Sequence, residues 1–130
     1  WIVCLFGVSF YASGVHDFEL IFAGEFMESP DDPNDLAKHK DKFLTSVNDD
    51  KKDYIKYIGS VSGQKKIELL NKANVLILPT NYHVEGQPVC IIEAMAYSCA
   101  VIATKYRSIP DIVNDTNCKF VQFGNVKDIM

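Results

Sequence analysis

The sequence has no long apolar segment, no excess of basic charge and no closely spaced pair of cysteines. Its most apolar stretch, residues 1–12, falls well short of the roughly 20 residues that a membrane helix needs, and with no basic segment before it we expect no signal peptide. Thirteen basic against seventeen acidic side chains give a net charge of -4, which argues against a protein that wraps nucleic acid or an anionic membrane. The four cysteines lie far apart, so neither a zinc site nor a small disulfide scaffold is indicated, and reduced thiols in a cytoplasmic protein are expected.

What is present is typical of one globular domain, with 48% hydrophobic and 23% charged residues in 130. Four short runs are mostly apolar rather than alternating, a pattern that predicts buried strands of a parallel sheet. These runs are Phe18–Ala23, Tyr54–Ile58, Asn74–Leu78 and Ala100–Ala103. A fifth candidate, Lys119–Phe123, would add an edge strand.

Helical patterns alternate with these runs. They lie at Asp32–Val47 with Pro33 near the start, behind Ser62, at Pro88–Ser98 and after Pro110. Alternating strands and helices predict an open, Rossmann-like α/β sheet. The opening residues are ambiguous, because their composition favours a strand while their lack of alternation and Ala-Ser-Gly ending also allow a helix end. Since the chain begins with Trp rather than Met, we expect a piece of a longer protein.

One polar loop, between Pro79 and Pro88, joins a predicted buried strand to a helix. Ligands of open α/β sheets bind in the crevice beyond the carboxyl ends of the strands. Gly86 would let the backbone approach a ligand closely. The positive end of the helix dipole would lie there together with outward-pointing amides, those of Gln87, Val89 and Cys90. This pattern predicts an anion site suited to a diphosphate.

Two carboxylates flank the predicted anion site. Glu93 lies in the second helical turn, and helical side chains lean toward their N-terminus, so it could accept hydrogen bonds from the vicinal hydroxyls of a ribose. Glu85 would lie on the other side of the diphosphate, beside a sugar to be transferred. The same residues also fit an ordinary helix start with a surface charge favoured by the dipole. Spacing alone leaves both interpretations open.

Glu85 and Glu93, separated by seven residues and followed by Ala-Met-Ala, resemble the donor-binding, C-terminal half of family-four retaining glycosyltransferases, the glycosyl transferases group 1, which have the GT-B fold. Further motifs follow in the same order along nearly the whole chain, at Phe18–Gly24, Tyr57–Gly59, Asn74–Pro79, Ala100–Thr104 and Ile109–Val113. The resemblance implies that Glu93 binds the donor ribose, that Glu85 approaches the transferred sugar, and that the nucleobase rests at Gly59. The amides after Glu85 would hold the sugar and diphosphate. No metal and no other cofactor is expected.

The chain departs from the family pattern at several turns and at its start. Ser98 stands where the family usually has Gly, Ala100 replaces a frequent Pro and Cys118 replaces a common Gly, and at these turn positions we expect the local backbone geometry rather than the chemistry to differ. The family's first strand, with an Arg and a Lys that hold the donor phosphates, would precede residue 1. The resemblance therefore favours a helix at residues 1–11 and a sheet that lacks its first strand.

The implied function is transfer of a sugar, with retention, from a nucleoside diphosphate sugar to an acceptor hydroxyl, as in polysaccharide or glycoconjugate biosynthesis. Residues 1–130 would form a partial donor-binding domain, and an acceptor glycan, lipid or protein would bind an absent N-terminal domain. The fragment alone would bind donor weakly, transfer nothing and could self-associate through an exposed sheet edge or apolar face. The full-length protein would be cytoplasmic and could lie at a membrane surface. Two alternatives remain, a GT-B-like nucleotide-sugar epimerase and a non-catalytic nucleotide-binding module in which only Glu93 would matter.

Other polar residues carry weaker signals. His83 could touch the sugar or have no role. Lys105 and Arg107 follow a strand end, where a solvated loop is favoured over ligand contact. Cys90 and Cys99 are interpreted as buried small hydrophobic residues rather than reactive thiols.

Overall fold

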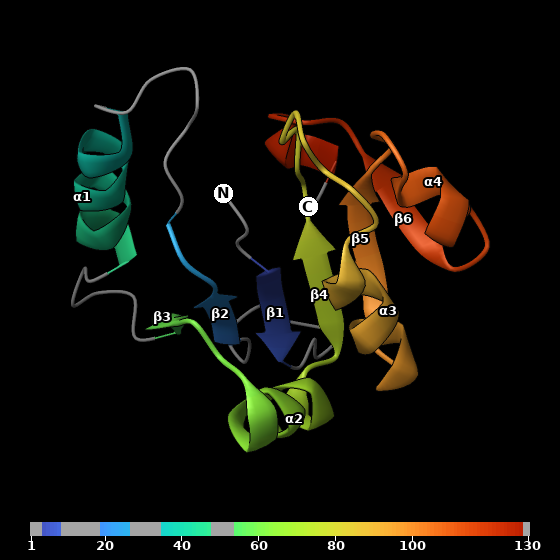
Figure 1. The fold of residues 1–130 in the computed structure, drawn as a ribbon, viewed down its shortest axis with the longest axis horizontal. Coiled ribbons are helices and arrows are strands. Elements are labelled where there is room, and N and C mark those ends of the chain that lie inside the picture. Colours follow the sequence, from blue (N-terminus) through green and yellow to red (C-terminus); the bar gives the residue numbers. More distant parts are fainter. Residues whose placement is uncertain (1–3, 9–18, 27–34, 48–53, 129–130) are drawn as a thin grey trace.

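The computed structural model describes residues 4–8, 19–26, 35–47 and 54–128. These residues form one six-stranded sheet in the order β3-β2-β1-β4-β5-β6, with helices between the strands (Figure 1). The elements are β1 (Cys4–Val8), β2 (Glu19–Ala23), α1 (Asp35–Val47), β3 (Ile55–Gly59), α2 (Gly63–Lys72), β4 (Val75–Leu78), α3 (Val89–Ala96), β5 (Ala100–Thr104), α4 (Ile109–Ile112), β6 (Cys118–Val121) and a short 3-10 helix, η1 (Val126–Asp128). The predicted Rossmann-like α/β fold class is confirmed.

The apolar runs identified the strands well. β2, β3, β4 and β5 each agree with a predicted run to within one residue at either end, and β6 begins one residue earlier than predicted. Ser62 precedes α2, as expected. α3 begins at Val89, one residue later than predicted, and ends at Ala96. The helix start predicted at Pro33 lies outside the described residues.

β1 is the main departure from the expected fold. The helix expected at residues 1–11 is wrong for Cys4–Val8, which form a strand antiparallel to both β2 and β4. The other strand pairs are parallel, and in Figure 1 the β1 arrow points opposite to those of β2 and β4. The sheet is therefore mixed. It was expected to lack its first strand, but β1 occupies a central position between β2 and β4.

A physical reason for β1 lies in its neighbours. A vacant position between β2 and β4 would leave two rows of backbone donors and acceptors without partners, which is costly inside a protein. Apolar and aromatic residues such as those of the opening segment also favour strands. With β1 in place, the exposed sheet edge that was one reason to expect self-association is hydrogen-bonded instead.

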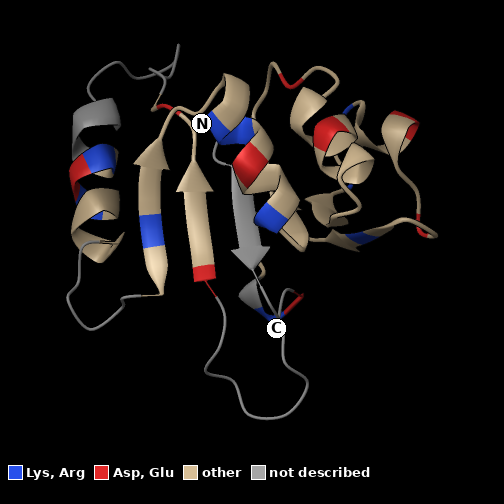
Figure 2. Cartoon of the chain, turned by 90° about the horizontal axis from the view of Figure 1, so that it is seen from below, with Lys and Arg blue, Asp and Glu red and all other residues tan. Residues whose placement is uncertain are grey.

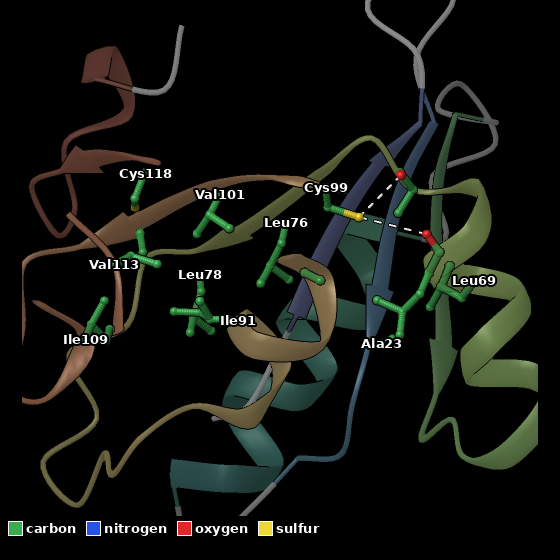
Figure 3. Close-up of a cluster of buried hydrophobic side chains, with 14 of the residues drawn as sticks. Ala23, Leu69, Leu76, Leu78, Ile91, Cys99, Val101, Ile109, Val113 and Cys118 are labelled. Atoms are coloured by element: carbon green, nitrogen blue, oxygen red, sulfur yellow. Dashed lines mark hydrogen bonds between the residues drawn. The ribbon is translucent and has the colours of Figure 1, made fainter. Parts of the chain in front are cut away.

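Helices pack on both faces of the sheet. Leu76 and Leu78 of β4 belong to a buried cluster that includes Ile91 of α3 and Ile109 of α4 (Figure 3). Alternate strand residues point to opposite faces, and on the other face Phe22 of β2 meets a different partner. Its ring lies edge-on to Phe43 of α1, with centroids 4.9 Å apart. All four residues of β4 are buried, as expected for a strand covered on both faces, whereas β3 alternates between half-buried and exposed residues.

Cys99, directly before β5, joins the core to α2. It is 5% exposed, and its thiol donates to the carbonyl oxygens of Ala73 at 3.3 Å and Leu70 at 3.8 Å (Figure 3). Burial raises the pKa of the Cys99 thiol, which lowers the fraction of reactive thiolate. The interpretation of Cys99 as a buried small residue is confirmed, whereas Cys90 is only half-buried.

The end of α3 explains one departure from the family pattern. Ser98 adopts a left-handed backbone conformation, with φ of 62°. Its amide donates to the carbonyl oxygen of Met95 at 3.0 Å, and the amide of Cys99 donates to that of Ala94 at 2.9 Å. These two bonds define a Schellman motif, whose left-handed position is usually occupied by glycine. The chain keeps the turn at the expense of backbone strain at Ser98.

Replacement of Ser98 by glycine is therefore expected to raise the free energy of unfolding by about 1 kcal/mol, because glycine has no Cβ to clash in this conformation. The measurement is urea unfolding followed by circular dichroism. Ser62→Gly is the matched control, since Ser62 is extended, with φ of -147° and no side-chain cap hydrogen bond. An equal gain in both variants, or a loss at Ser98, would contradict the left-handed turn.

Candidate functional site

The candidate site lies at the carboxyl edge of the parallel strands. β4 and β5 are paired neighbours, so the loop that follows β4, residues 79–88, lies beside the loop that follows β5, residues 105–108. β3 ends at this same edge with Gly59. Ligands of open α/β sheets bind at this edge.

Three hydroxyl groups fix the loop after β4. The Thr104 hydroxyl donates to the carbonyl oxygen of Thr80 at 2.5 Å, and the Thr80 hydroxyl accepts from the amide of Tyr82 at 3.0 Å. Both threonines are buried. The Ser108 hydroxyl donates to the carbonyl oxygen of Gly86. The sequence prediction did not include these residues, and the available signal was a hydroxyl residue at the end of each of two adjacent strands.

Glu85 and Gly86 lie at the exposed side of this loop. The Glu85 amide donates to the carbonyl oxygen of Tyr82 at 2.9 Å, which forms a tight turn, and the Glu85 side chain is partly exposed. A Cβ added at Gly86 would meet no atom within 4 Å. No packing inside the described protein therefore requires glycine at this position. Gln87 is exposed, and the rings of Tyr82 and His83 lie 5.3 Å apart.

The N-terminus of α3 follows directly. Pro88 is the buried N-cap residue, and its side chain has no oxygen that could accept from the helix amides. Helical bonding begins where the Ile91 amide donates to the carbonyl oxygen of Pro88 at 3.0 Å. The first-turn amides and the positive end of the dipole face the loop that carries Glu85. Val89 is 62% exposed beside them.

Glu93 has a partner that the sequence prediction missed. Its Oε1 lies 2.5 Å from the Nζ of Lys66, in the first turn of α2. The Glu93 side chain is 32% exposed and that of Lys66 is 36% exposed. Glu93 is therefore held in an ion pair between two helices, and is not simply a solvated charge near a helix start. The only sequence clue was the place of Lys66 on the buried stripe of α2.

Gly59 lies apart from these residues. Its φ of 69° is left-handed, and its carbonyl oxygen accepts from the amide of Gly24 at 2.9 Å, so the strand end itself accounts for the glycine. β2 and β1 separate β3 from β4, which places Gly59 about 14 Å along the edge from the β4 loop. The predicted site residues thus form a group around the start of α3 and a separate point at Gly59.

The remaining polar candidates lie nearby without forming a metal site. The Nζ of Lys105 lies 5.5 Å from the ring centre of Phe120, and the Arg107 guanidinium lies 5.7 Å from that of Tyr106. Among the described residues, no group of three His, Cys, Asp or Glu side chains could hold a metal ion. Figure 2 shows that Lys and Arg positions and Asp and Glu positions both occur along the described helices. None of the described helices is both long enough and apolar enough to cross a membrane.

Together these features define a Rossmann-like α/β domain with a candidate ligand site at the carboxyl edge of its sheet. A family model described as "Glycosyl transferases group 1" matches residues 12–129, and this chain belongs to that family. The general activity of this family is glycosyl transfer from a donor to an acceptor. No curated protein and no solved structure matched the chain. The family match begins after β1, so β1 lies outside the part of the chain that the family describes.

Proposed function

We propose that this chain is the donor-binding domain of a retaining, family-four glycosyltransferase of the GT-B type. It would bind a nucleoside diphosphate sugar and present it to an acceptor hydroxyl held by a second domain. The observation that carries this proposal is the placement of two carboxylates around one helix start: Glu85 in the loop before α3 and Glu93 in its second turn. The two sugars that flank the diphosphate of such a donor, the ribose and the hexose, both offer hydroxyl groups, and a carboxylate accepts hydrogen bonds from such groups.

The diphosphate would lie between the two carboxylates, at the start of α3. The amides of Gln87, Val89 and Cys90 and the helix dipole suit an anion. Glu93 would bind the ribose and Glu85 the sugar, with the nucleobase along the edge toward Gly59. The hydrogen bonds from the Thr104 hydroxyl to the carbonyl of Thr80 and from the Ser108 hydroxyl to the carbonyl of Gly86 would hold the loop in place for this purpose.

The reaction would break the bond between the sugar's anomeric carbon and the diphosphate while the acceptor hydroxyl oxygen bonds to that carbon on the same face, and the hydroxyl proton would pass to the departing diphosphate. Negative charge then grows on the departing diphosphate, and the fixed amide dipoles at the start of α3 would stabilise it. Helix amides can compensate this charge without a bound cation. The proposed binding is therefore independent of divalent metal.

The test is a thermal-shift panel of UDP, GDP and ADP with their sugar nucleotides at millimolar concentration, followed by calorimetry on the best binder. Ligand at ten times its dissociation constant is expected to stabilise the chain by about 1.4 kcal/mol. The affinity should stay within about twofold when a chelator and then magnesium are added. No stabilisation by any member of the panel, or a strong and saturable requirement for magnesium, would contradict the proposal.

A further inference from the structure

Lys66 occupies an unusual position for a lysine. It shares the inner stripe of α2 with Leu69, Leu70 and Ala73, which follow it at helical spacing and are 7%, 3% and 6% exposed. A charged group on such a stripe is unfavourable unless it finds a partner. Lys66 reaches out of the stripe and contacts Glu93 of α3, with Nζ 2.5 Å from Oε1.

The pair lies near the ligand edge. α2 begins shortly after the end of β3, and α3 begins directly after the loop that follows β4. The first turns of both helices are therefore close to the carboxyl ends of their preceding strands. Lys66 belongs to the first turn of α2 and Glu93 to the second turn of α3, so the ion pair joins two helices that begin at the edge carrying the proposed nucleobase and diphosphate positions.

Stability alone is a weak reason for this pair. Both side chains are about one-third exposed, and ion pairs with this much solvent contact contribute little to the free energy of folding. The pair has a larger effect on orientation, because a free glutamate side chain samples several rotamers and must lose that freedom to bind a ligand. A carboxylate has about four acceptor positions, so contact with Lys66 through Oε1 leaves capacity for two ligand hydroxyls.

We infer that Lys66 is a positioning residue for the donor ribose, which it recognises indirectly by fixing the carboxylate of Glu93. This inference rests on the proposed function, in which Glu93 accepts hydrogen bonds from the ribose hydroxyls. Lys66 also offsets the negative charge of Glu93 beside a negatively charged diphosphate. Orientation and charge compensation can be separated, because only orientation depends on the presence of the ribose hydroxyls.

The experiment compares ribose discrimination in variants of the chain. The probes are UDP, GDP and ADP, each with its 2′,3′-dideoxy analogue, and the measured quantity is the ratio of the two dissociation constants. In the unsubstituted chain the ribonucleotide is expected to bind about 10- to 100-fold more tightly, the size expected for hydrogen bonds to a charged acceptor. Lys66→Met should reduce this ratio to within about threefold of unity, as should Glu93→Gln.

Two controls exclude simpler explanations. Lys65→Met removes the same charge from the neighbouring, exposed position and should leave the ratio unchanged. Lys66→Arg keeps a cation at the site and should restore most of the discrimination. Urea unfolding of each variant checks that the fold is retained.

The outcomes separate the two proposals. If Glu93→Gln removes the discrimination and Lys66→Met does not, the role of Lys66 is overturned while the ribose site stands. If the unsubstituted chain shows no discrimination, or Glu93→Gln leaves it intact, the ribose assignment fails and the role of Lys66 fails with it. Loss of discrimination in Lys65→Met as well would show a general charge effect and would also overturn the positioning role.

Discussion

Replacement of Ile91 by alanine is expected to lower the free energy of unfolding by about 3 kcal/mol, within the range of about 2 to 5 kcal/mol for large-to-small substitutions in a core. Ile91 is 0% exposed and belongs to the same buried cluster as Leu76 and Leu78 of β4 (Figure 3). The change removes buried methyl groups and leaves a cavity between α3 and the sheet. Urea unfolding measures the loss.

Ile92 provides a control on the same helix. It follows Ile91 directly in the sequence and has the same side chain, but it is 48% exposed. Ile92→Ala should therefore change the free energy of unfolding by less than about 1 kcal/mol, since little apolar area is lost and alanine is the better helix former. Equal losses in the two variants would contradict the orientation of α3, and with it the placement of Glu93 toward α2.

The strands could be predicted from the sequence because buried strands have a distinctive local composition. Runs such as Asn74–Leu78 and Ala100–Ala103 are apolar without alternation, and only a strand covered on both faces requires this. The loop after β4 was predictable for a related reason, since Gly86 and Pro88 mark a strand-to-helix turn. The boundaries moved by a residue because Pro88 serves as the N-cap of α3 rather than its first helical residue.

β1 could not be predicted in the same way. Its residues favour a strand locally, but the family pattern favoured a helix, and the pattern does not extend to them because the family match begins at residue 12. What decides the conformation is tertiary: β2 and β4 each present backbone groups that β1 satisfies by antiparallel pairing. Local propensity and tertiary hydrogen bonding agree here, and it was the resemblance to the family that wrongly favoured a helix.

The contacts that build the site were the least accessible from sequence. Lys66 and Glu93 come from different helices, and no local rule pairs them. The bond from Thr104 to Thr80 likewise depends on the register in which β4 and β5 align. Sequence reasoning could select Glu85 and Glu93 as candidate ligand groups. It could not show that one of them is held by a lysine and the other lies in a loop tied to the next strand.

Substitution of Glu93 and substitution of Glu85 are expected to have different effects on the affinities for a nucleoside diphosphate and for its sugar nucleotide. Glu93→Ala should weaken binding of both ligands by about 1 to 3 kcal/mol, because it would remove the proposed hydrogen bonds between the ribose and a charged acceptor. Glu85→Ala should leave the affinity for the nucleoside diphosphate nearly unchanged and abolish the additional affinity for the sugar nucleotide. Calorimetry with UDP, GDP or ADP and the corresponding sugar nucleotide measures both effects.

Folding does not obscure this comparison. Glu93 loses only a partly exposed ion pair with Lys66, worth at most about 1 kcal/mol, and Glu85 is partly exposed in its loop. Unchanged affinity in Glu93→Ala would contradict the ribose assignment. If Glu85→Ala weakens binding of the nucleoside diphosphate as much as Glu93→Ala does, Glu85 contacts the nucleotide rather than the sugar. If Glu85→Ala changes neither ligand, the site holds a nucleotide without engaging the sugar, and a non-catalytic binding module becomes the better description of this domain.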